Sequence, residues 1–161
     1  MRKLIFLFVL FTTFASSEIV KDIKITGNER ITDETIIMFG SIDANIDYND
    51  QKINKVLKNL YETDFFENVS ITLNNNILYI KIIENPIIQS INIKGIKNKR
   101  ILEVLNENLI LKQKTSFIKN KVKKDETNLK NILKSNGYYF AEINTKIKKN
   151  ENNTIDLIYD I

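Results

Sequence analysis

Few of the residue types that usually carry enzyme chemistry occur in this chain. Its 161 residues include neither histidine nor cysteine, which excludes Cys/His zinc sites, cysteine nucleophiles, Ser–His pairs and histidine bases. Carboxylates, lysines, tyrosines and hydroxyls remain, and no spacing gathers them into a site. Asp43, Asp47 and Asp50 come nearest to a calcium loop, but their spacing is wrong and no glutamate closes it. We therefore expect no catalytic residue, no metal, no cofactor and no enzymatic activity.

The charge balance gives no reason to expect a nucleic-acid partner. Lys and Arg outnumber Asp and Glu by 24 to 20. Without Arg2 and Lys3, which belong to the leader described next, the counts become 22 and 20. A net charge this small is not the basic footprint that nucleic-acid binding requires.

The start of the chain has the pattern of a secretory signal peptide. Two basic residues precede an apolar run at residues 4–14, and Ala15-Ser16-Ser17 supplies the small residues that a signal peptidase reads. The run covers about eleven residues, roughly half of what a membrane-spanning helix needs. We predict that residues 1–17 are removed before Glu18 and that the mature chain is exported.

The rest of the chain consists of two copies of one unit. Residues 19–31 read IVKDIKITGNERI, and residues 87–101 read IIQSINIKGIKNKRI. Pro86, the only proline, stands between the copies. We place unit one at residues 18–85 and unit two at residues 86–161. Units of this size are small but can form a core of their own.

The first half of unit one is predicted to form a strand and a short helix. Apolar residues alternate over residues 19–25 and then meet a Gly-Asn turn. The helix spans residues 31–39, with Thr32 or Asp33 as its cap and Gly40 as its end. On the strand, the inner face should carry Ile19, Ile23 and Ile25.

The second half of unit one is predicted to form a longer helix and a hairpin. Asn49 or Asp50 caps the helix, and Asp64 follows it where the chain must turn through positive φ. Strands at residues 69–73 and 77–83 flank an asparagine turn. The buried face of the helix should carry Ile53, Val56, Leu57 and Leu60.

Unit two repeats this order with a longer middle. We predict a strand at residues 87–94, a helix around Leu105, and a second helix from Ile118 to Leu133. Gly137 takes the place of Asp64 in the turn that follows. Two strands complete the unit, with inward residues Ala141, Ile143, Thr145 and Ile147 on one and Ile155, Leu157, Tyr159 and Ile161 on the other.

These elements predict an α+β fold of two tandem βααββ domains. Each domain should be a three-stranded mixed sheet with two helices covering one face, because neither layer can bury its apolar side alone. The hairpin makes the last two strands neighbours, and the first strand most simply joins the far side of the last. The predicted strand order is therefore first–third–second, which leaves the second strand with a free edge.

Several segments of the chain resemble the POTRA domains of BamA-type outer-membrane assembly factors. ITGNERI, LYETDFFENVSI and IIENPII are similar to the first such domain, and SNGYYFAEI with NNTIDLIYDI is similar to the second. They arrive in the family's order behind a signal peptide. Asp64 stands where that motif commonly has Gly, and Ile96 where Asn often follows Gly95. Both are turn positions, so the fold is not in doubt.

The resemblance implies a periplasmic module, associated with the outer membrane through a barrel that this chain does not contain. Its expected partners are unfolded outer-membrane proteins docked by β-augmentation, periplasmic chaperones, accessory lipoproteins of the assembly complex, and the barrel in cis if the gene continues. No nucleic acid is expected. An alternative is the POTRA pair of a two-partner secretion or translocation-and-assembly transporter.

We expect the docking edges to be the strand at residues 68–74 in unit one and the strand at residues 142–148 in unit two. Both show polar alternation backed by an apolar face. The alternative is an ordinary solvated edge protected by lysines. The candidate docking residues are Ser70, Ile71, Thr72, Leu73, Asn74, Glu142, Ile143, Asn144, Thr145 and Lys146.

Two other groups of residues have competing interpretations. Lys119, Lys121, Lys123 and Lys124 could meet phospholipid headgroups, but the pattern favours a solvated helix face. The aromatic run 138–140 could be a partner patch. Its place at a helix–strand corner favours core packing with a half-exposed tyrosine.

Overall fold

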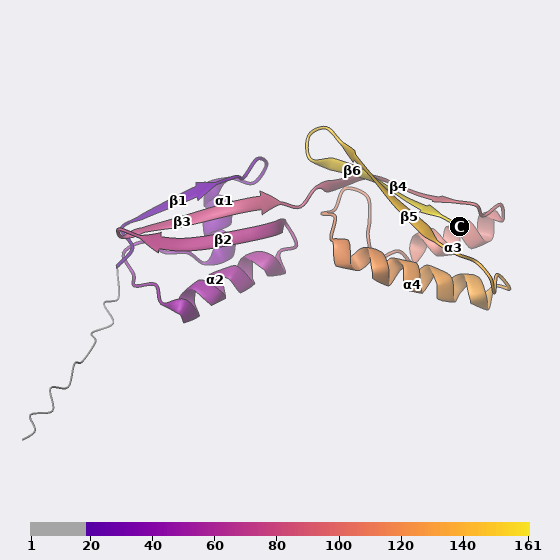
Figure 1. Ribbon diagram of the computed structural model, residues 1–161, viewed down its shortest axis with the longest axis horizontal. Helices are drawn as coiled ribbons and strands as arrows, with labels where there is room; N and C mark the ends of the chain where they lie inside the picture. Colours follow the sequence, from indigo (N-terminus) through magenta and orange to yellow (C-terminus); the bar gives the residue numbers. More distant parts are fainter. Residues whose placement is uncertain (1–18) are drawn as a thin grey trace, which may run out of the picture.

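The computed structural model describes residues 19–161, so the predicted leader and its cleavage before Glu18 lie outside the described residues. The chain runs βααββ twice (Figure 1). Unit one contains β1 (Asp22–Thr26), α1 (Asp33–Gly40), α2 (Asp50–Glu62), β2 (Phe66–Asn74) and β3 (Ile77–Glu84). Unit two contains β4 (Ile87–Lys94), α3 (Lys99–Glu107), α4 (Lys119–Ser135), β5 (Asn144–Asn150) and β6 (Thr154–Asp160).

The strand order confirms the predicted topology. The sheets read β1-β3-β2 and β4-β6-β5. In each sheet the outer first strand runs parallel to the central strand and the second strand runs antiparallel to it. The central strand therefore carries the ladder on both sides, while the second strand is paired on one side alone.

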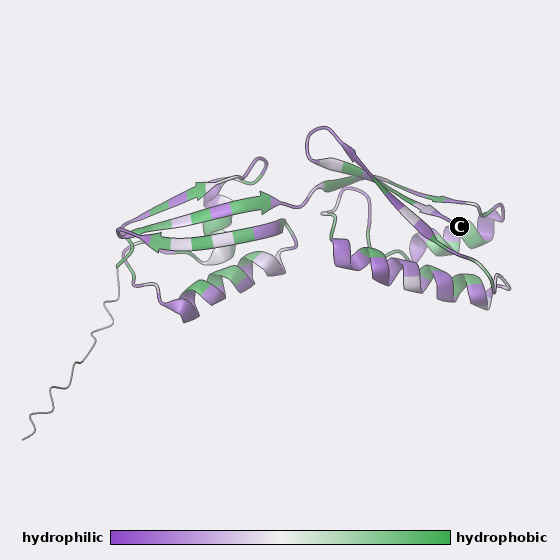
Figure 2. Cartoon of the chain, in the orientation of Figure 1, coloured by the Kyte–Doolittle hydropathy of each residue, from purple (hydrophilic) through white to green (hydrophobic). Residues whose placement is uncertain are grey.

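Each unit has its own hydrophobic core. On the central strands, alternate residues are buried: Leu78, Ile80 and Ile82 in unit one, and Ile155, Leu157 and Tyr159 in unit two. The helices lay their apolar faces over them, with Val56 and Leu60 in one core and Leu129 and Leu133 in the other. Figure 2 shows the hydrophobic residues gathered on the strands and along one side of the helices. Each fully buried side chain of this kind contributes about 1.5–3 kcal/mol.

The caps of the first two helices are as predicted, but the end of α1 is not. Thr32 and Asn49 are the N-caps. Gly40 was predicted to close α1, yet it is the last helical residue, and Ser41 takes the left-handed conformation with φ 52°. A Cβ at Gly40 would crowd the side chain of Ile42. Glycine is therefore required here for packing rather than for the turn.

The first strand begins later than predicted. Ile19 was expected on the inner face, but it is 52% exposed, and Val20 is fully buried. Val20 does not pair with the sheet. Its N–H donates to the carbonyl of Ile46 (2.9 Å), and its carbonyl accepts from the N–H of Asn45 (2.7 Å). This pairing reverses the side-chain alternation ahead of β1, whereas Ile23 and Ile25 pack on the core as predicted.

The predicted turns hold positive φ. Asp64 and Gly137 follow α2 and α4 with φ of 61° and 91°, and Asn75 and Asn76 turn the hairpin of unit one at 51° and 62°. Asparagine and aspartate tolerate this region because their short side chains can bond locally.

A buried carboxylate lies at the end of unit one, next to the seam between the units at residues 85 and 86. Glu84 is 3% exposed and accepts the backbone N–H groups of Glu29, Arg30 and Ile31 at 2.9–3.0 Å, together with Nε of Arg30 at 2.9 Å. Burial acts to raise its pKa. The N–H groups of Ile31, Arg30 and Glu29 and the Arg30 charge together outweigh burial, so the pKa of Glu84 lies below its usual value.

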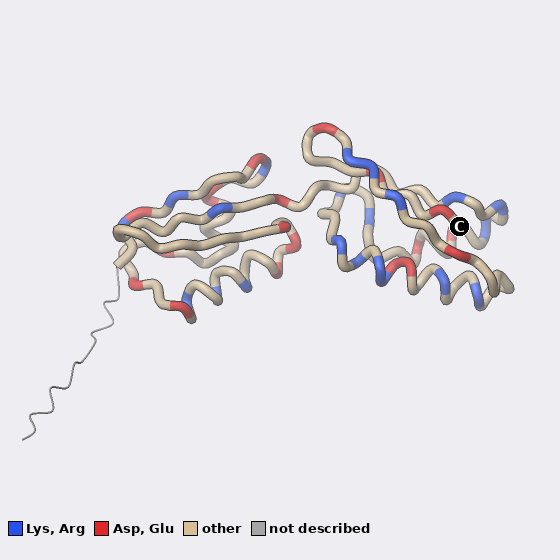
Figure 3. Tube along the Cα trace, in the orientation of Figure 1, with Lys and Arg blue, Asp and Glu red and all other residues tan. Residues whose placement is uncertain are grey.

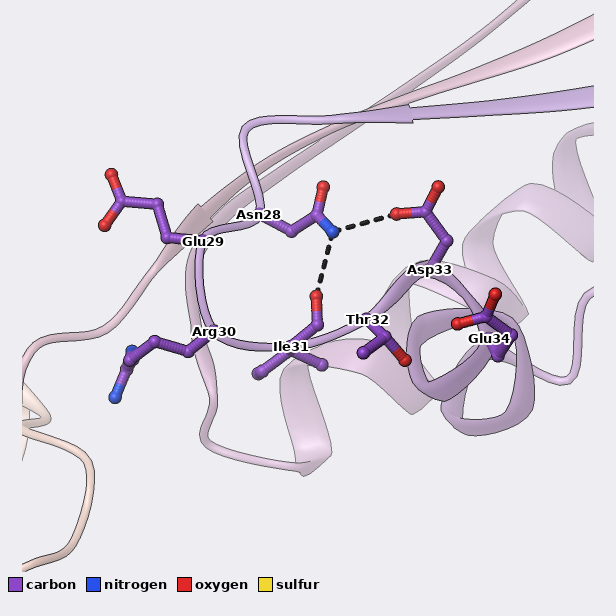
Figure 4. A pocket seen from close by; sticks show the side chains of 7 residues that line it. All are labelled: Asn28, Glu29, Arg30, Ile31, Thr32, Asp33 and Glu34. Atoms are coloured by element: carbon purple, nitrogen blue, oxygen red, sulfur yellow. Dashed lines mark hydrogen bonds between the residues drawn. The ribbon is translucent and has the colours of Figure 1, made fainter.

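The loop held by Glu84 forms a shallow hollow of about 340 Å³. Figure 4 shows the amide of Asn28 pointing to the carbonyl of Ile31 and the carboxylate of Asp33, at 2.8 Å each, while Arg30 points away from them. These polar groups satisfy one another, so we read the hollow as part of the loop's structure.

Two contacts tie the units together across the seam. Lys121 on α4 forms an ion pair with Asp64 of unit one at 2.6 Å. Asn153, in the hairpin of unit two, donates from Nδ2 to the carbonyl of Glu84 at 3.3 Å. The helix-end turn of unit one therefore lies against unit two.

Candidate functional site at two open sheet edges

Each sheet has two edge strands, and their edges differ in cover. Next to β4, the segment 114–117 makes backbone bonds with Pro86 and Ile88: Ile88 donates to Thr115 (2.9 Å), Lys114 donates to Ile88 (2.8 Å), and Phe117 donates to Pro86 (2.8 Å). Val20 pairs with residues 45 and 46 just ahead of β1, and β1 itself has five residues. The longer edges available for pairing are those of β2 and β5.

One hydrogen bond identifies the outward backbone groups of β2. The N–H of Val69 donates to the hydroxyl of Tyr61 on α2 at 3.0 Å, so it points away from β3. In an antiparallel pair, successive residues direct their N–H and C=O groups to opposite sides. The unpaired edge is therefore formed by the backbone groups of Val69, Ile71 and Leu73, and the intervening residues bond to β3.

The same rule assigns the outward groups of β5. Oγ1 of Thr145 donates to Oε1 of Glu126 at 2.5 Å, which places the Thr145 side chain on the face covered by α4. The two sheets share strand order, strand direction and covered face. For L-residues, these three features together fix the edge to which a residue's backbone points. The open edge of β5 therefore presents Thr145, Ile147 and Lys149.

The structure distributes the predicted docking residues unevenly. Ser70 to Asn74 lie in β2, and Asn144, Thr145 and Lys146 lie in β5. Glu142 and Ile143 were predicted on the edge strand, but they precede β5. The ladder of β5 with β6 starts with Asn144 opposite Asp160.

Of the predicted residues, Ile71, Leu73 and Thr145 have outward backbone groups. Ser70, Thr72, Asn74, Asn144 and Lys146 direct theirs into the sheet. Val69 and Ile147 lie within the predicted docking strands but were not among the candidate docking residues, and Lys149 lies just beyond the predicted strand. The sequence could have identified them, because the predicted strand order and the face that each side chain occupies together fix the edge to which each backbone group points.

On the outer face of unit two, polar contacts join the side chains of neighbouring strands. Lys146 pairs with Asp160 at 2.9 Å, and this hydrogen bond and charge lower the pKa of Asp160. Hydrogen bonds to Asp156 from Ser90 (2.6 Å) and Asn150 (2.9 Å) lower the pKa of Asp156. These contacts hold β5 to β6 and leave its other edge accessible.

A groove lies between α4 and the open edge of β5. It has a volume of about 700 Å³ and is lined by Val122, Lys123 and Glu126 from α4 and by Thr145 and Ile147 from β5. In unit one, by contrast, α2 packs closely along β2. The two open edges therefore differ in the room beside them.

The aromatic run after α4 is more exposed than predicted. We expected core packing with a half-exposed tyrosine, but Tyr138, Tyr139 and Phe140 are 38%, 68% and 97% exposed. The N–H of Tyr138 bonds back to Leu133 (3.0 Å), which bends the chain at the helix end. Ala141 and other residues beyond the bend then pack on the core in place of the aromatic rings.

This architecture has a known counterpart. The sequence profile of the family described as "POTRA: Surface antigen variable number repeat" matches residues 18–85 and 86–161. The chain belongs to the POTRA family.

Two curated relatives of this POTRA pair carry the name outer membrane protein assembly factor BamA. The one from Neorickettsia risticii is 25% identical over 147 residues, covering 91% of this chain and 20% of the relative. The one from Neisseria meningitidis serogroup B is 28% identical over 141 residues, covering 86% and 18%. The chain therefore spans about a fifth of the length of these relatives.

Solved POTRA structures share the fold of this pair. The N-terminal domain of Omp85 from Thermosynechococcus elongatus has a TM-score of 0.57 at 11% identity, covering 89% of this chain and 63% of that one. POTRA3-5 of Haemophilus influenzae BamA scores 0.52 at 15% identity, covering 94% and 68%. POTRA1-2 of Omp85 from Anabaena also scores 0.52, at 12% identity, covering 88% and 93%. Differently numbered POTRA domains thus fit equally well, and the assignment of this pair as the first and second stays a prediction.

Over residues 19–161, no helix combines the length and apolarity needed to cross a bilayer.

Proposed function

We propose that this POTRA pair docks extended segments of unfolded outer-membrane proteins by β-augmentation, as a non-catalytic part of outer-membrane protein assembly. The proposal takes residues 1–17 as a cleaved leader, residues 18–85 and 86–161 as the two folding units, and the periplasm as their location. It also includes periplasmic chaperones and accessory lipoproteins as partners, and an outer-membrane barrel that carries the pair.

The observation that carries the proposal is the row of outward backbone groups on β2 and β5. An extended chain laid against them gains main-chain hydrogen bonds that do not depend on its sequence. Strands of outer-membrane barrels alternate apolar and polar residues. Such a segment can extend a sheet whose edge strand has an apolar inner face and a polar outer face, because its own side chains alternate in the same way.

The two edges differ in how many outward residues are free to pair with an added strand. On β2 the hydroxyl of Tyr61 already occupies the N–H of Val69, so an added strand pairs first with Ile71 and Leu73. On β5 the outward residues are Thr145, Ile147 and Lys149, and the first two line the groove beside α4. We therefore assign the principal docking edge to β5.

Amide hydrogen exchange tests this proposal without any substitution. A barrel-strand peptide of about ten residues is added to the labelled protein, and exchange is followed by NMR. The amides of Ile147 and Thr145 should exchange more slowly when the peptide is bound. Those of Lys146 and Lys148, which bond within the sheet, should change little and are the internal control. Unchanged exchange at Ile147 under saturating peptide would contradict docking at β5.

A further inference from the structure

The groove beside β5 combines an apolar floor with basic walls. Val122 and Ile147 form its apolar part, and Ile147 is 44% exposed although it lies on the covered side of the sheet. Lys119, Lys123 and Lys124 lie along the α4 side. None of these three lysines forms an ion pair with any residue in the described part of the chain.

The groove has one acidic residue, Glu126. Its carboxylate accepts the hydroxyl of Thr145 and is held at the strand. Its charge offsets one of the three lysines, so the lining of the groove keeps a net positive charge. A hollow of about 390 Å³ continues the groove toward the seam; it shares Lys119 and Ile147 with the groove and adds Lys149. Figure 3 shows Lys and Arg positions along both α4 and β5.

The matching edge of unit one has a different charge. β2 reads FENVSITLN, with one glutamate and no lysine, whereas β5 reads NTKIKKN, with three lysines. The two edges share strand order and direction but differ in the room beside them, and their charge is a second feature that can distinguish the segments that they accept.

We propose that the groove between α4 and β5 selects extended peptide segments whose groove-facing side chains combine an apolar residue with acidic residues. The inference rests on the proposed docking function and adds its selectivity. In the complex the peptide backbone pairs with Thr145, Ile147 and Lys149, and an apolar side chain enters beside Val122. The residues two before and two after this apolar residue face the same side of the peptide strand, and their carboxylates lie near Lys119 and Lys123. The unpaired backbone groups beside these lysines favour a peptide over a lipid surface, because lipid headgroups have no peptide backbone to pair with them.

Three labelled peptides of about ten residues test the selectivity by fluorescence anisotropy. They share an apolar residue at one groove-facing position and carry glutamate, serine or lysine two residues before and two residues after it. The wild-type protein should bind the glutamate peptide about tenfold more tightly than the serine peptide, since two or three exposed charge contacts contribute that much together. The lysine peptide should bind most weakly, and added salt should reduce the differences.

Charge-reversed variants locate the effect. Lys123→Glu with Lys124→Glu should remove the preference for glutamate. Lys97→Glu with Lys99→Glu makes the same change in net charge on exposed residues outside the groove and should keep it. Lys123 and Lys124 are exposed, so the α4 variant should fold, and its amide NMR spectrum verifies this.

The outcomes separate the inference from the function on which it rests. Equal binding of all three peptides, unaffected by either variant, would overturn the selectivity and leave docking in place. Absence of binding for every peptide would overturn docking itself. If the Lys123 and Lys124 variant lost binding to anionic phospholipid vesicles while peptide binding was unchanged, the lysines would serve a membrane surface, and the inference would be wrong.

Discussion

The hydroxyl of Tyr61 accepts the N–H of Val69 at 3.0 Å, so a side chain from α2 occupies the first outward position on the edge of β2. The same hydroxyl donates to Oδ1 of Asn68 at 3.4 Å. Unit one therefore protects the start of its open strand with its own helix, a common way to limit unwanted strand pairing.

Replacing Tyr61 by phenylalanine should expose this position. The lost hydrogen bond is partly solvated, so the free energy of unfolding should fall by about 1 kcal/mol or less. Exchange of the Val69 amide should become faster in the free protein, and it should be slowed by an added peptide that does not slow it in the wild type. Tyr79→Phe changes another half-exposed tyrosine on the central strand and should do neither.

The low pKa of Glu84 should make unit one sensitive to acid. Its carboxylate is stabilised in the folded state, so its contribution is complete above the unfolded pKa of 4.5 and is lost as pH falls through the lower folded pKa. Urea unfolding between pH 5 and pH 3 should show a steeper loss of stability for the wild type than for Glu84→Gln. At pH 7 the variant should be about 1–3 kcal/mol less stable, because the amide has no charge and places an NH2 group opposite Nε of Arg30 in place of the carboxylate oxygen. Parallel pH profiles for the two proteins would contradict this role.

Asp125 should stabilise unit two through its three donors. It is fully buried and accepts the N–H groups of Ile110 (2.6 Å) and Leu111 (3.2 Å) and the hydroxyl of Tyr159 (3.0 Å). Burial and the neighbouring Asp125 charge raise the pKa of Tyr159, so its hydroxyl stays a donor.

Asp125→Ala should lower the stability of unit two by about 3 kcal/mol or more, because it leaves these donors buried without an acceptor. Tyr159→Phe removes one donor and should cost about 1 kcal/mol. Amide exchange at Leu111 and at Leu78 reports the two units separately, and only Leu111 should respond. An equal response at Leu78 would mean that the units unfold together.

Two glycines with positive φ should respond differently to alanine. At Gly27, with φ of 88°, a Cβ would overlap the carbonyl oxygen of Ile82. Gly27→Ala should therefore cost about 3 kcal/mol or more, from backbone strain and overlap together. At Gly137 nothing lies within 4 Å of a built Cβ, so Gly137→Ala should cost about 1 kcal/mol from its backbone conformation alone. Chemical denaturation of both variants measures the difference, and similar losses would contradict the overlap at Gly27.

Local sequence determined most of the secondary structure. The caps Thr32 and Asn49, the turns at Asp64 and Gly137, and the buried alternation of Ile80 and its neighbours depend on nearby residues and on the period of the apolar pattern. Strand order followed as well, because a short hairpin fixes one neighbour and one side of the central strand remains for the other.

Tertiary structure alone decided which atoms are accessible. Val20 is buried because residues 45 and 46 pair with it, and Phe140 is 97% exposed because the chain bends back at Tyr138. The groove beside Ile147 exists because α4 is not packed closely along β5 as α2 is along β2. Each of these outcomes depends on contacts between segments distant in the chain. A pattern read over a few neighbouring residues specifies which face is apolar, but it does not specify what other segment covers that face.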